Sequence, residues 1–401
     1  MRNVRRVLSN YSADLYGVCS ALYELDGLCV MHDASGCNST YNTHDEPRWY
    51  DIDSMVYVSG LTETDAIMGS DQRLIDDVCE TAEMAHPRFI ALSGSPMPYM
   101  LGTDFQGIAR VIEKRTGIPS FGFKTNGMRP YVRGAADAYL AVADRFCTGR
   151  TPRKPGSRLA VNLIGVTPLD FSIVGNAEAL RKIYEEAGFD VLSCWSMGDS
   201  LDDLSHAGNA DVTAVVSSTG LKAARLLEER FGIPYITGIP VGKNYSERLL
   251  EQTRKLAENF RSGKNAGNAA PAADPHIRFS QKPEGKRTWI IGEAVNSASL
   301  RHCLEQDLGV DDVSVVCPTG SHGGVLRPGD LMFDEEDRFE DLLNENARMV
   351  IADPFYSRLL PENSPVKFIE FPHEAFSGRF YHDRMPVFIG PDFLNWLRAR
   401  I

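Results

Sequence analysis

Short apolar runs alternate with longer amphipathic runs along this chain. Residues 88–93, read RFIALS, predict a buried strand, and residues 103–116 predict the helix that follows it. Thr103 and Gln106 have the spacing of a capping box at the start of that helix, and Gly117-Ile-Pro119 ends it. The next apolar run, at residues 120–123, predicts another strand. The pattern is that of a strand–helix–strand crossover unit.

The same unit recurs further along the chain. Residues 211–218 predict a strand, residues 221–231 a helix that ends at Gly232-Ile-Pro234, and residues 235–239 the next strand. Residues 347–354 and 364–371 form a weaker version, and further strand–helix openings begin at residues 158 and 287. Strands that are almost wholly apolar are typical of parallel sheets with helices on both faces. The predicted fold class is therefore α/β, with three doubly wound, Rossmann-like domains built on parallel sheets.

The three groups of units place the domains at residues 1–150, 151–275 and 276–401. Residues 262–275 are rich in Gly, Ala, Asn and Pro, so we expect the second domain to end in a flexible linker or surface loop. Ligands of parallel α/β sheets bind at the carboxyl ends of the strands. The loops that follow the predicted strands are therefore the candidate walls of a site.

Composition and charge narrow the class of protein. The chain has 401 residues, of which 43% are hydrophobic and 24% charged, as is usual for soluble globular proteins. Its formal charge of −12 argues against binding to nucleic acid or to an anionic membrane surface. The sequence contains no apolar run of membrane-spanning length, and its first residues lack the apolar core of a signal peptide. We therefore expect a cytoplasmic location.

Eight cysteines are too few for a disulfide scaffold in a chain of this length, and no CxxC pair occurs. Most have the spacing of core residues, including Cys19 within a predicted helix. Cys37 differs, because it follows Gly36 in a polar turn just after an apolar run. Glycine lets the backbone approach a bulky group, and amides of a turn can donate to the sulfurs of a cluster. On this chemistry Cys37 is either a ligand or nucleophile, or an ordinary turn cysteine.

Nucleotide-binding fingerprints are missing from the sequence. It has no GxxxxGK[ST] motif and no clear GxGxxG motif directly after a predicted strand. We therefore expect no P-loop binding of ATP. If ATP drives the chemistry, another protein hydrolyses it.

Three motifs in the first third carry a resemblance. They are His32-Asp-Ala-Ser-Gly-Cys37, Thr62-Glu-Thr-Asp-Ala-Ile-Met-Gly-Ser70 and Ser95-Pro-Met-Pro-Tyr-Met-Leu-Gly-Thr-Asp104. They resemble "His-Gly-x-x-Gly-Cys", "T-E-x-D-x-x-x-G-G" and "Cys-Pro-x-x-x-Ile-Gly-Asp-Asp" of component 1 of nitrogenase and its relatives. Those relatives include the dark-operative protochlorophyllide reductase, the cofactor-assembly scaffold of nitrogenase and the nickel-tetrapyrrole reductive cyclase. Weaker similarity continues downstream and implies the same three-domain architecture.

The resemblance implies that Cys37 ligates an iron–sulfur cluster at a subunit interface. The fullest family pattern has three cysteines, but this chain has Ala13 near the first position and Ser95 at the third. The chain is therefore similar to the one-ligand half of an asymmetric pair. A homodimer that pairs two Cys37 residues, with Cys19 or Ser95 in the remaining positions, stays open. As ordinary residues, Cys19 would pack in a helix core and Ser95 would form a turn.

The function implied is that of a subunit in the catalytic component of a two-component, ATP-dependent, nitrogenase-like reductase. Its cofactor is expected to be an iron–sulfur cluster, of the 4Fe-4S type, shared between subunits. Its expected partners are a homologous second subunit or a second copy, and a nucleotide-dependent iron–sulfur reductase similar to the nitrogenase iron protein. Tetrapyrrole reduction, small-molecule reduction and metallocofactor assembly are all compatible with the motifs.

Further site residues follow from position. Gly36 is expected to shape the backbone beside the cluster, and Glu63 and Asp65 to brace the Cys37 turn, with simple helix capping as their alternative. His373 comes just after the predicted strand at residues 366–371 and is the candidate proton donor.

Two interpretations from other classes remain. In one, the fold persists as a non-redox binding protein or a cofactor-assembly scaffold, without catalysis. In the other, repeated Rossmann-like domains carry out group transfer, which the acidic charge and the missing phosphate loop disfavour.

Overall fold

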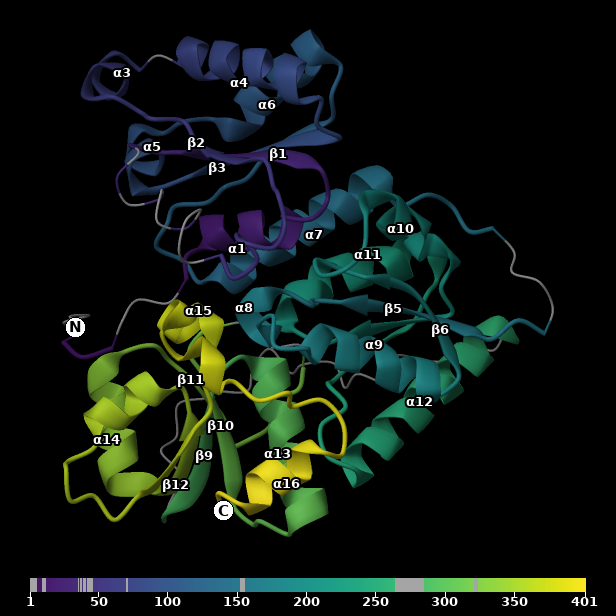
Figure 1. Cartoon of the computed structure of the whole chain (residues 1–401), viewed down its shortest axis with the longest axis vertical. Helices are drawn as coiled ribbons and strands as arrows, with labels where there is room; N and C mark the ends of the chain where they lie inside the picture. The colour runs from purple at the N-terminus through teal and green to yellow at the C-terminus, as the bar shows by residue number, and fades with distance from the viewer. Residues whose placement is uncertain are drawn as a thin grey trace.

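The computed structural model describes residues 6–8, 12–34, 36, 38, 41, 46–69, 71–151, 156–263, 285–320 and 324–401. It contains three parallel β-sheets with helices packed around them, as Figure 1 shows. The sheets lie within residues 27–122, 159–237 and 287–370, one in each predicted domain. The predicted fold class is confirmed, whereas the exact domain boundaries remain a prediction.

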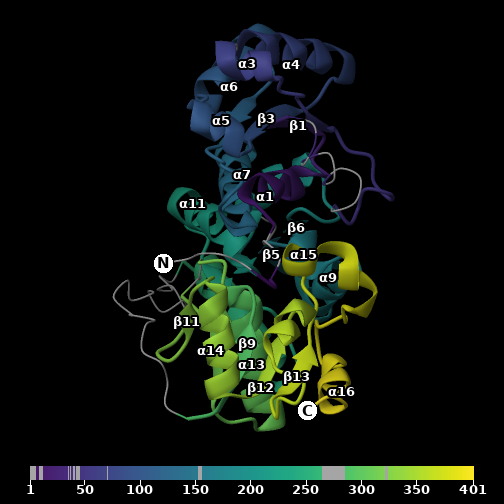
Figure 2. The same ribbon diagram turned by 90° about the vertical axis from the view of Figure 1, so that its left-hand side faces the viewer.

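The first sheet has the strand order β2-β1-β3-β4. Its two central strands are buried along their whole length, because helices cover both faces. One face packs against α4 and α6 and the other against α1 and α7 (Figures 1 and 2). The elements are α1 (Asp14–Leu22), β1 (Gly27–His32), β2 (Val56–Val58), α3 (Glu63–Met68), α4 (Asp71–Ala85), β3 (Phe89–Gly94), α5 (Pro96–Leu101), α6 (Phe105–Thr116), β4 (Ser120–Gly122) and α7 (Tyr131–Phe146).

The second sheet has the order β6-β5-β7-β8 and is again parallel throughout. Its strands are β5 (Leu159–Ile164), β6 (Phe189–Cys194), β7 (Val212–Val215) and β8 (Tyr235–Thr237). Its helices are α8 (Pro168–Phe171), α9 (Asn176–Glu186), α10 (Leu201–Ser205), α11 (Leu221–Phe231) and α12 (Asn244–Arg261), with short 3₁₀ turns at His206–Asn209 and Ser218–Gly220.

The third sheet has five strands in the order β11-β10-β9-β12-β13. They are β9 (Arg287–Ile291), β10 (Val313–Cys317), β11 (Leu331–Met332), β12 (Ala347–Ala352) and β13 (Lys367–Glu370). The helices are α13 (Ala294–Leu308), α14 (Glu336–Asn346), α15 (Glu374–Ser377) and α16 (Phe393–Arg398), with 3₁₀ segments at Pro354–Leu359 and Gly378–Arg384.

The first crossover unit forms as predicted, except at the start of its helix. The predicted capping box of Thr103 and Gln106 is wrong: Asp104 is the N-cap residue of α6, and no side chain caps the helix there. Thr103 instead ends the preceding helix, where its N–H bonds to the carbonyl of Pro98. The predicted stop at Gly117 is confirmed, with a left-handed φ of 72° that suits glycine. A short intervening helix, α5, is what displaced the cap.

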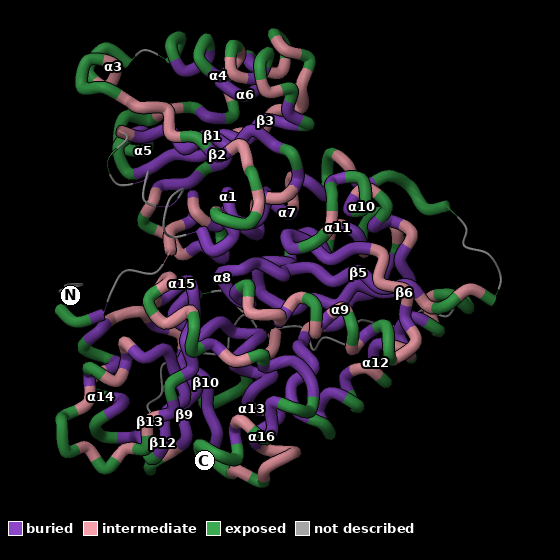
Figure 3. The backbone as a smooth tube through the Cα atoms, in the orientation of Figure 1, coloured by how far each residue is buried: buried purple, intermediate pink, exposed green. Residues whose placement is uncertain are grey.

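Each sheet with its surrounding helices is called here the first, second or third unit, and apolar clusters extend from one unit into the next. Figure 3 shows buried backbone running from one sheet to the next. The final segment, residues 385–397, lies beyond the third sheet in sequence but contributes Phe388 and Phe393 to an apolar cluster with second-sheet residues such as Leu163. A β-bridge between Val241 and Gly390 fastens it there. The predicted linker at residues 262–275 lies mostly outside the described residues, from residue 264 onward.

Candidate functional site

A cavity of about 680 Å³ lies between the first and third units. On one side are the loops that follow β1 and β3, and on the other is the short helix α15. Its wall includes Gly36 and Ser95, two of the predicted site residues, together with Asp33, Tyr16, Met97 and Glu374. The cavity therefore has the expected position for a parallel-sheet site, at the carboxyl ends of the strands.

Strand pairing brings the residues of this wall together. β1 and β3 are neighbours with His32 opposite Gly94, so the next residues, Asp33 and Ser95, emerge side by side. The Ser95 hydroxyl donates to one oxygen of the Asp33 carboxylate, and the Asn38 amide donates to the other. Tyr16 from α1 donates to Asn38 at 2.8 Å. The turn after β1 is thus fixed to the turn after β3.

His32, the last residue of β1, holds the start of the turn after β1 in place. His32 is buried and hydrogen-bonds through Nδ1 to Ser59, which follows β2, at 2.8 Å. Burial lowers the pKa of His32. Its ring also meets the edge of Phe105 on α6, with the centroids 6.0 Å apart. His32 therefore links the end of β1 to the residue that follows β2 and to the start of α6.

Cys37 lies outside the described residues. Its neighbour Gly36 is exposed and lines the cavity, and a Cβ atom added there would meet no heavy atom within 4 Å. The described backbone therefore leaves open space at Gly36, on the side where a Cβ atom would lie. Whether Cys37 itself is a ligand remains a prediction.

Cys19 does not line this cavity in the described part of the wall. It is fully buried on α1, beside the Cys29 thiol of β1, in the core beneath the first sheet. The neighbouring Cys29 thiol and burial raise the pKa of Cys19. A thiol held in its neutral form suits packing better than ligation, so the position favours the core role.

Glu63 and Asp65 lie on α3. Asp65 closes a capping box with Thr62 and forms an ion pair of 2.7 Å with the exposed Arg73. The Thr62 hydroxyl lowers the pKa of Asp65. Asp65 thus caps its own helix, as the helix-capping alternative expects, and Glu63 occupies the first turn of the same helix, none of whose residues is buried. Neither belongs to the described wall of the cavity.

His373 is buried at the N-cap of α15, where the three units meet. Its Nδ1 accepts from the Ala375 N–H at 3.3 Å, and its ring stacks on Phe376 at 4.4 Å. Its Nε2 has no hydrogen bond among the described residues and lies 3.4 Å from an oxygen of the buried Asp170. Tyr131 donates to the same carboxylate. His373 therefore faces the junction below the cavity rather than the described wall.

A second buried acid shares this junction. Glu293 accepts hydrogen bonds from Ser218 and from the first N–H groups of α13, among them that of Val295. Burial, aided by the charge of Asp170, raises the pKa of Glu293 to about 7. The junction therefore contains a carboxyl group whose pKa lies near neutral pH.

Glu374, the neighbour of His373, does line the cavity. Its Oε1 accepts from the Ser172 hydroxyl at 2.6 Å and is 2.6 Å from Nδ1 of His382. The hydrogen bond to Glu374 raises the pKa of His382. No local sequence pattern marks this group, because Ser172 is 202 residues from Glu374 and only the fold joins them.

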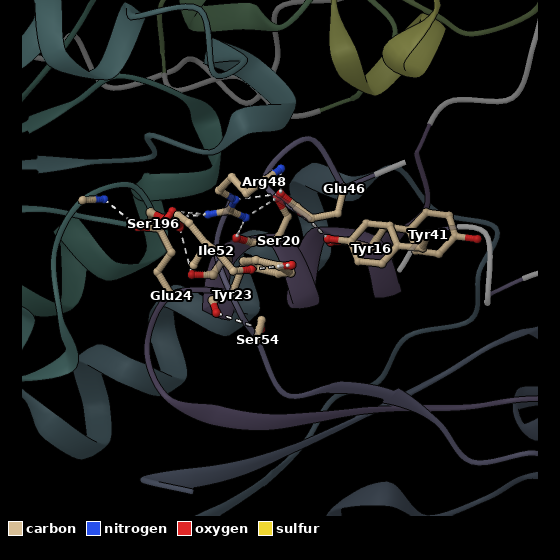
Figure 4. Close-up of polar contacts among 12 residues, drawn as sticks. Tyr16, Ser20, Tyr23, Glu24, Tyr41, Glu46, Arg48, Ile52, Ser54 and Ser196 are labelled. Carbon is tan, nitrogen blue, oxygen red and sulfur yellow. Dashed lines mark hydrogen bonds and ion pairs between the residues drawn. The ribbon is translucent and has the colours of Figure 1, made fainter. Parts of the chain in front are cut away.

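A buried arginine also has no clear local signature in the sequence. Arg48 pairs with Glu46 at 2.7 Å and Glu24 at 2.9 Å, and donates to the carbonyls of Ser20 and Ser196 (Figure 4). The cluster thus joins the segment after the Cys37 turn to the second unit. Its one sequence signal was the run Glu46-Pro-Arg48, too short to be distinguished from a surface pair.

Glu46 extends this cluster toward the cavity. It accepts from the Tyr41 hydroxyl at 2.8 Å, and Tyr41 stacks on Tyr16, with ring centroids 4.8 Å apart (Figure 4). Tyr16 is a wall residue. A chain of contacts therefore runs from Arg48 to the cavity.

The fold and this cavity define a class: a three-unit α/β protein with a site between its first and third units. Residues 17–353 match the family model described as nitrogenase component 1 type oxidoreductase. The chain belongs to this family, as its motifs predicted. Among the described residues, no helix combines the length and the apolar character needed to cross a bilayer.

Individual relatives are distant. The chain is 24% identical, over 358 residues, to the nitrogenase molybdenum-iron protein alpha chain of Methanothermobacter marburgensis, covering 82% of this chain and 70% of that one. It is 25% identical to a subunit of the light-independent protochlorophyllide reductase of Prosthecochloris aestuarii, covering 64% of this chain and 51% of that protein. It is 23% identical to the nitrogenase iron-molybdenum cofactor biosynthesis protein NifE of Bradyrhizobium diazoefficiens, covering 80% and 58%.

Solved structures share the fold. The structure titled "Nitrogenase Cp1 at pH 6.5" superposes with a TM-score of 0.70 at 15% identity, covering 100% of this chain and 90% of that one. At this identity the likeness establishes architecture alone. The family assignment rests on the family model, and the role within the family has to be argued from the site.

Proposed function

We propose that this protein is a subunit of the catalytic component of a two-component, ATP-dependent, nitrogenase-like reductase. It would hold an iron–sulfur cluster at the Cys37 turn and relay electrons to a substrate in the adjoining cavity. The observation that carries the proposal is the meeting of the Gly36 turn and the Ser95 turn at one cavity. These are the two turns whose motifs resemble cluster-binding segments of the family to which the chain belongs.

The donor set supports a shared site. The described residues contain no group of three or more His, Cys, Asp or Glu side chains that could hold a metal ion. Ser95 and Asp33 are bonded to each other, so Cys37 is the ligand that this proposal requires from the chain. A second polypeptide would supply the other ligands, and we propose the 4Fe-4S type from the resemblance of these motifs to the family.

The surface beside the cavity supports a partner there. Helix α5 begins at the Ser95 turn and exposes Met97, Tyr99, Met100 and Leu101. An apolar patch of this kind is typical of a protein–protein interface. We propose a homologous second subunit or a second copy of the chain as its occupant, with a nucleotide-dependent iron–sulfur reductase as the electron donor.

The chain's own residues would have separate tasks. When bound, the cluster would supply single electrons. The Asp33–Ser95 bond fixes the two turns, and the apolar residues of the wall would pack against a bound substrate. We propose His373 as a proton donor that acts from the junction below the cavity, where its Nε2 lies 3.4 Å from an oxygen of Asp170 and would hold the proton. Replacing His373 with Gln should then lower reduction while leaving the iron content unchanged.

Anaerobic purification tests the cluster directly. The wild type should be brown, contain iron and acid-labile sulfide, and lose both in Cys37→Ala. Cys79→Ala is the matched control, because Cys79 is a half-buried cysteine of α4 outside the cavity wall, and it should keep the cluster. A wild type free of iron when co-expressed with its genomic neighbours would refute the proposal.

A cofactor-assembly scaffold is the second candidate, and the similarity to a protein named for cofactor biosynthesis favours it. The two roles differ in the fate of the iron. A reductase subunit keeps its cluster through many turnovers, whereas a scaffold passes iron and sulfide to an added apo-acceptor in stoichiometric amount.

A further inference from the structure

Two cavities lie next to each other at β4, the outermost strand of the first sheet. One has a volume of about 720 Å³ and is lined by α6, α7 and β4, and the other has a volume of about 440 Å³ and is lined by the start of α6 and the residues that follow β4. Their walls have Gln106, Phe123, Lys124 and Arg133 in common, so the two form one site, called here the edge groove. None of its described wall residues belongs to the described wall of the cavity beside Gly36. The edge groove is therefore a separate site, at the carboxyl end of a strand, where parallel sheets bind ligands.

The acids of the edge groove are already paired, whereas several of its cations are not. The cations of the wall are Arg110, Lys124, Arg129, Arg133 and Lys222, and the acids are Asp104, Asp137 and Asp144. Asp104 pairs with Arg110 at 3.9 Å, and Asp137 pairs with Lys222. Asp144 pairs with Arg230, which lies outside the wall. Lys124, Arg129 and Arg133 form no ion pair with any described residue, so a net positive charge is left in the groove.

The three unpaired cations all line the smaller cavity, and they come from one segment that runs from the end of β4 into the first turn of α7. Lys124 and Arg133 are exposed, and neither side chain forms a hydrogen bond with a described residue. Arg129 is half-buried, and its guanidinium donates to the backbone carbonyl of Lys124 at 3.2 Å, which keeps it beside Lys124. Like charges around one cavity repel each other, and an anion placed between them removes that cost. In a chain with a formal charge of −12 such a gathering is local, and it marks this cavity as a site for an anion.

Neutral donors and apolar surface complete the edge groove. The Thr103 hydroxyl and the Gln106 amide line the smaller cavity, and neither forms a side-chain hydrogen bond with a described residue. Both can therefore donate to the oxygens of an anion. The larger cavity offers the apolar side chains of Phe121, Leu140 and Ala141, which are partly buried. The groove thus joins a cationic end to a part with apolar surface.

We propose that the edge groove binds an organic phosphate. Lys124, Arg129 and Arg133 hold the phosphate group, and the organic body lies against Phe121 and Leu140 in the larger cavity. A planar guanidinium group can bond to two phosphate oxygens at once, and a dianion neutralises more of the excess charge than a single carboxylate does. The volume of each cavity is typical of a small-molecule site. This site is independent of the proposed function, because it requires no iron–sulfur cluster.

Three probes separate the phosphate group from the organic body: 1-naphthyl phosphate, inorganic phosphate and the neutral 1-naphthalenemethanol. Binding to the purified full chain is measured by titration calorimetry at about pH 8, where a phosphate monoester is a dianion because its second pKa is about 6. The ester should bind at least about 10-fold more tightly than either of the other two probes. If the neutral alcohol binds as tightly as the ester, or if the ester does not bind, the inference is overturned. If inorganic phosphate binds as tightly as the ester, the groove holds an adventitious ion only, and the inference fails as well.

Removing the unpaired cations should weaken the binding of the ester and leave the fold intact, because Lys124 and Arg133 are exposed. Lys124→Gln and Arg133→Gln should each lower the affinity for 1-naphthyl phosphate by at least about 5-fold, as expected for a charge-assisted hydrogen bond. Lys114→Gln on α6 and Arg225→Gln on α11 are the matched controls, because both residues are exposed cations outside the walls of the groove. The controls should keep the wild-type affinity. Equal losses in controls and groove variants, or no loss in either, would refute the inference.

Gln106→Glu tests the same site by adding a negative charge to the wall that both cavities share. Gln106 is exposed in the first turn of α6, where an acidic residue is favourable, so this variant should fold. The ester should then bind at least about 10-fold more weakly, and an unchanged affinity would place it elsewhere and overturn the inference. A peptide of seven glutamates should bind the wild type more weakly than the ester does. Tighter binding of the peptide would make the groove a docking surface for an acidic protein, which would also refute the inference.

Discussion

Removing the positive charge of Arg48 should destabilise the protein far more than the loss of an ordinary ion pair. The side chain is 3% exposed, and its main partner, Glu46, is fully buried. Arg48→Met keeps most of the apolar stem but leaves the Glu46 carboxylate with the Tyr41 hydroxyl and backbone as its remaining donors. Breaking a buried pair on one side costs about 3–5 kcal/mol, so we expect a loss of that size in the free energy of unfolding.

Arg88 provides the comparison. It pairs with Asp202 at 2.6 Å and, like Arg48, joins the first unit to the second, but the two side chains are 48% and 68% exposed. Arg88→Met should therefore cost about 0–1 kcal/mol. The double variant Arg48→Met with Glu46→Gln should be less destabilised than Arg48→Met alone, because no charge is then left buried without its partner.

Urea unfolding followed by circular dichroism and tryptophan fluorescence measures all four proteins. The shift of the midpoint, taken with the slope of each transition, gives the difference in free energy. If Arg48→Met shifts the midpoint no further than Arg88→Met does, the buried cluster does not hold the units together as we argue. The same conclusion follows if Glu46→Gln adds to the loss instead of reducing it.

Two further predictions concern packing and pH. Gly134→Ala should lower the free energy of unfolding by about 1–3 kcal/mol or more, and the thermal midpoint with it, because a Cβ atom there would lie 1.8 Å from the carbonyl oxygen of Asp14 on α1. Gly149→Ala is the control: a Cβ atom at Gly149 would meet no heavy atom within 4 Å, so the free energy of unfolding should change by about 0.5 kcal/mol or less. Equal midpoints for the two variants would contradict the close contact of α1 and α7. Glu293 has a pKa of about 7 in the folded protein and 4.5 in the unfolded chain, so the folded state binds more protons between these two pH values. The contribution of Glu293 to the free energy of unfolding therefore falls as pH rises from 4.5 through 7. Denaturation across this range should show a steeper fall for the wild type than for Glu293→Gln, and parallel curves would refute the assignment.

Local patterns in the sequence were sufficient to predict the fold class. The near-continuous apolar runs of β1, β3, β5 and β9 required helices on both sheet faces, and Gly117 and Gly232 marked helix ends that the structure has with left-handed φ values of 72° and 71°. Local patterns failed where a short element intervened. Thr103 and Gln106 had the right spacing for a cap, but α5, which ends at Leu101 with Gly102 as its C-cap, moved the helix start by one residue.

The site was predictable only in part. The turns at Gly36 and Ser95 could be found, because each follows an apolar strand and neighbouring parallel strands end at the same edge. Glu374, Ser172 and His382 could not, because their contact spans about half of the chain and depends on how α8 and α15 pack. Arg48 was equally hidden, since burial, which gives its ion pairs their strength, has no signature in a charged tripeptide.

The contact of residues 6–8 with α14 has a consequence for how the first unit can move. The backbone N–H groups of Arg6, Val7 and Leu8 all bond to the Glu336 carboxylate of the third unit, and Leu8 enters that unit's apolar core. Residues 6–8 therefore pack on the third unit, although the chain that follows them forms first the first unit, then the second and finally the third. Any opening between the first and third units must therefore break the bonds to Glu336 or separate residues 6–8 from the first unit, so a label attached to Val7, which is 40% exposed, would report on that opening.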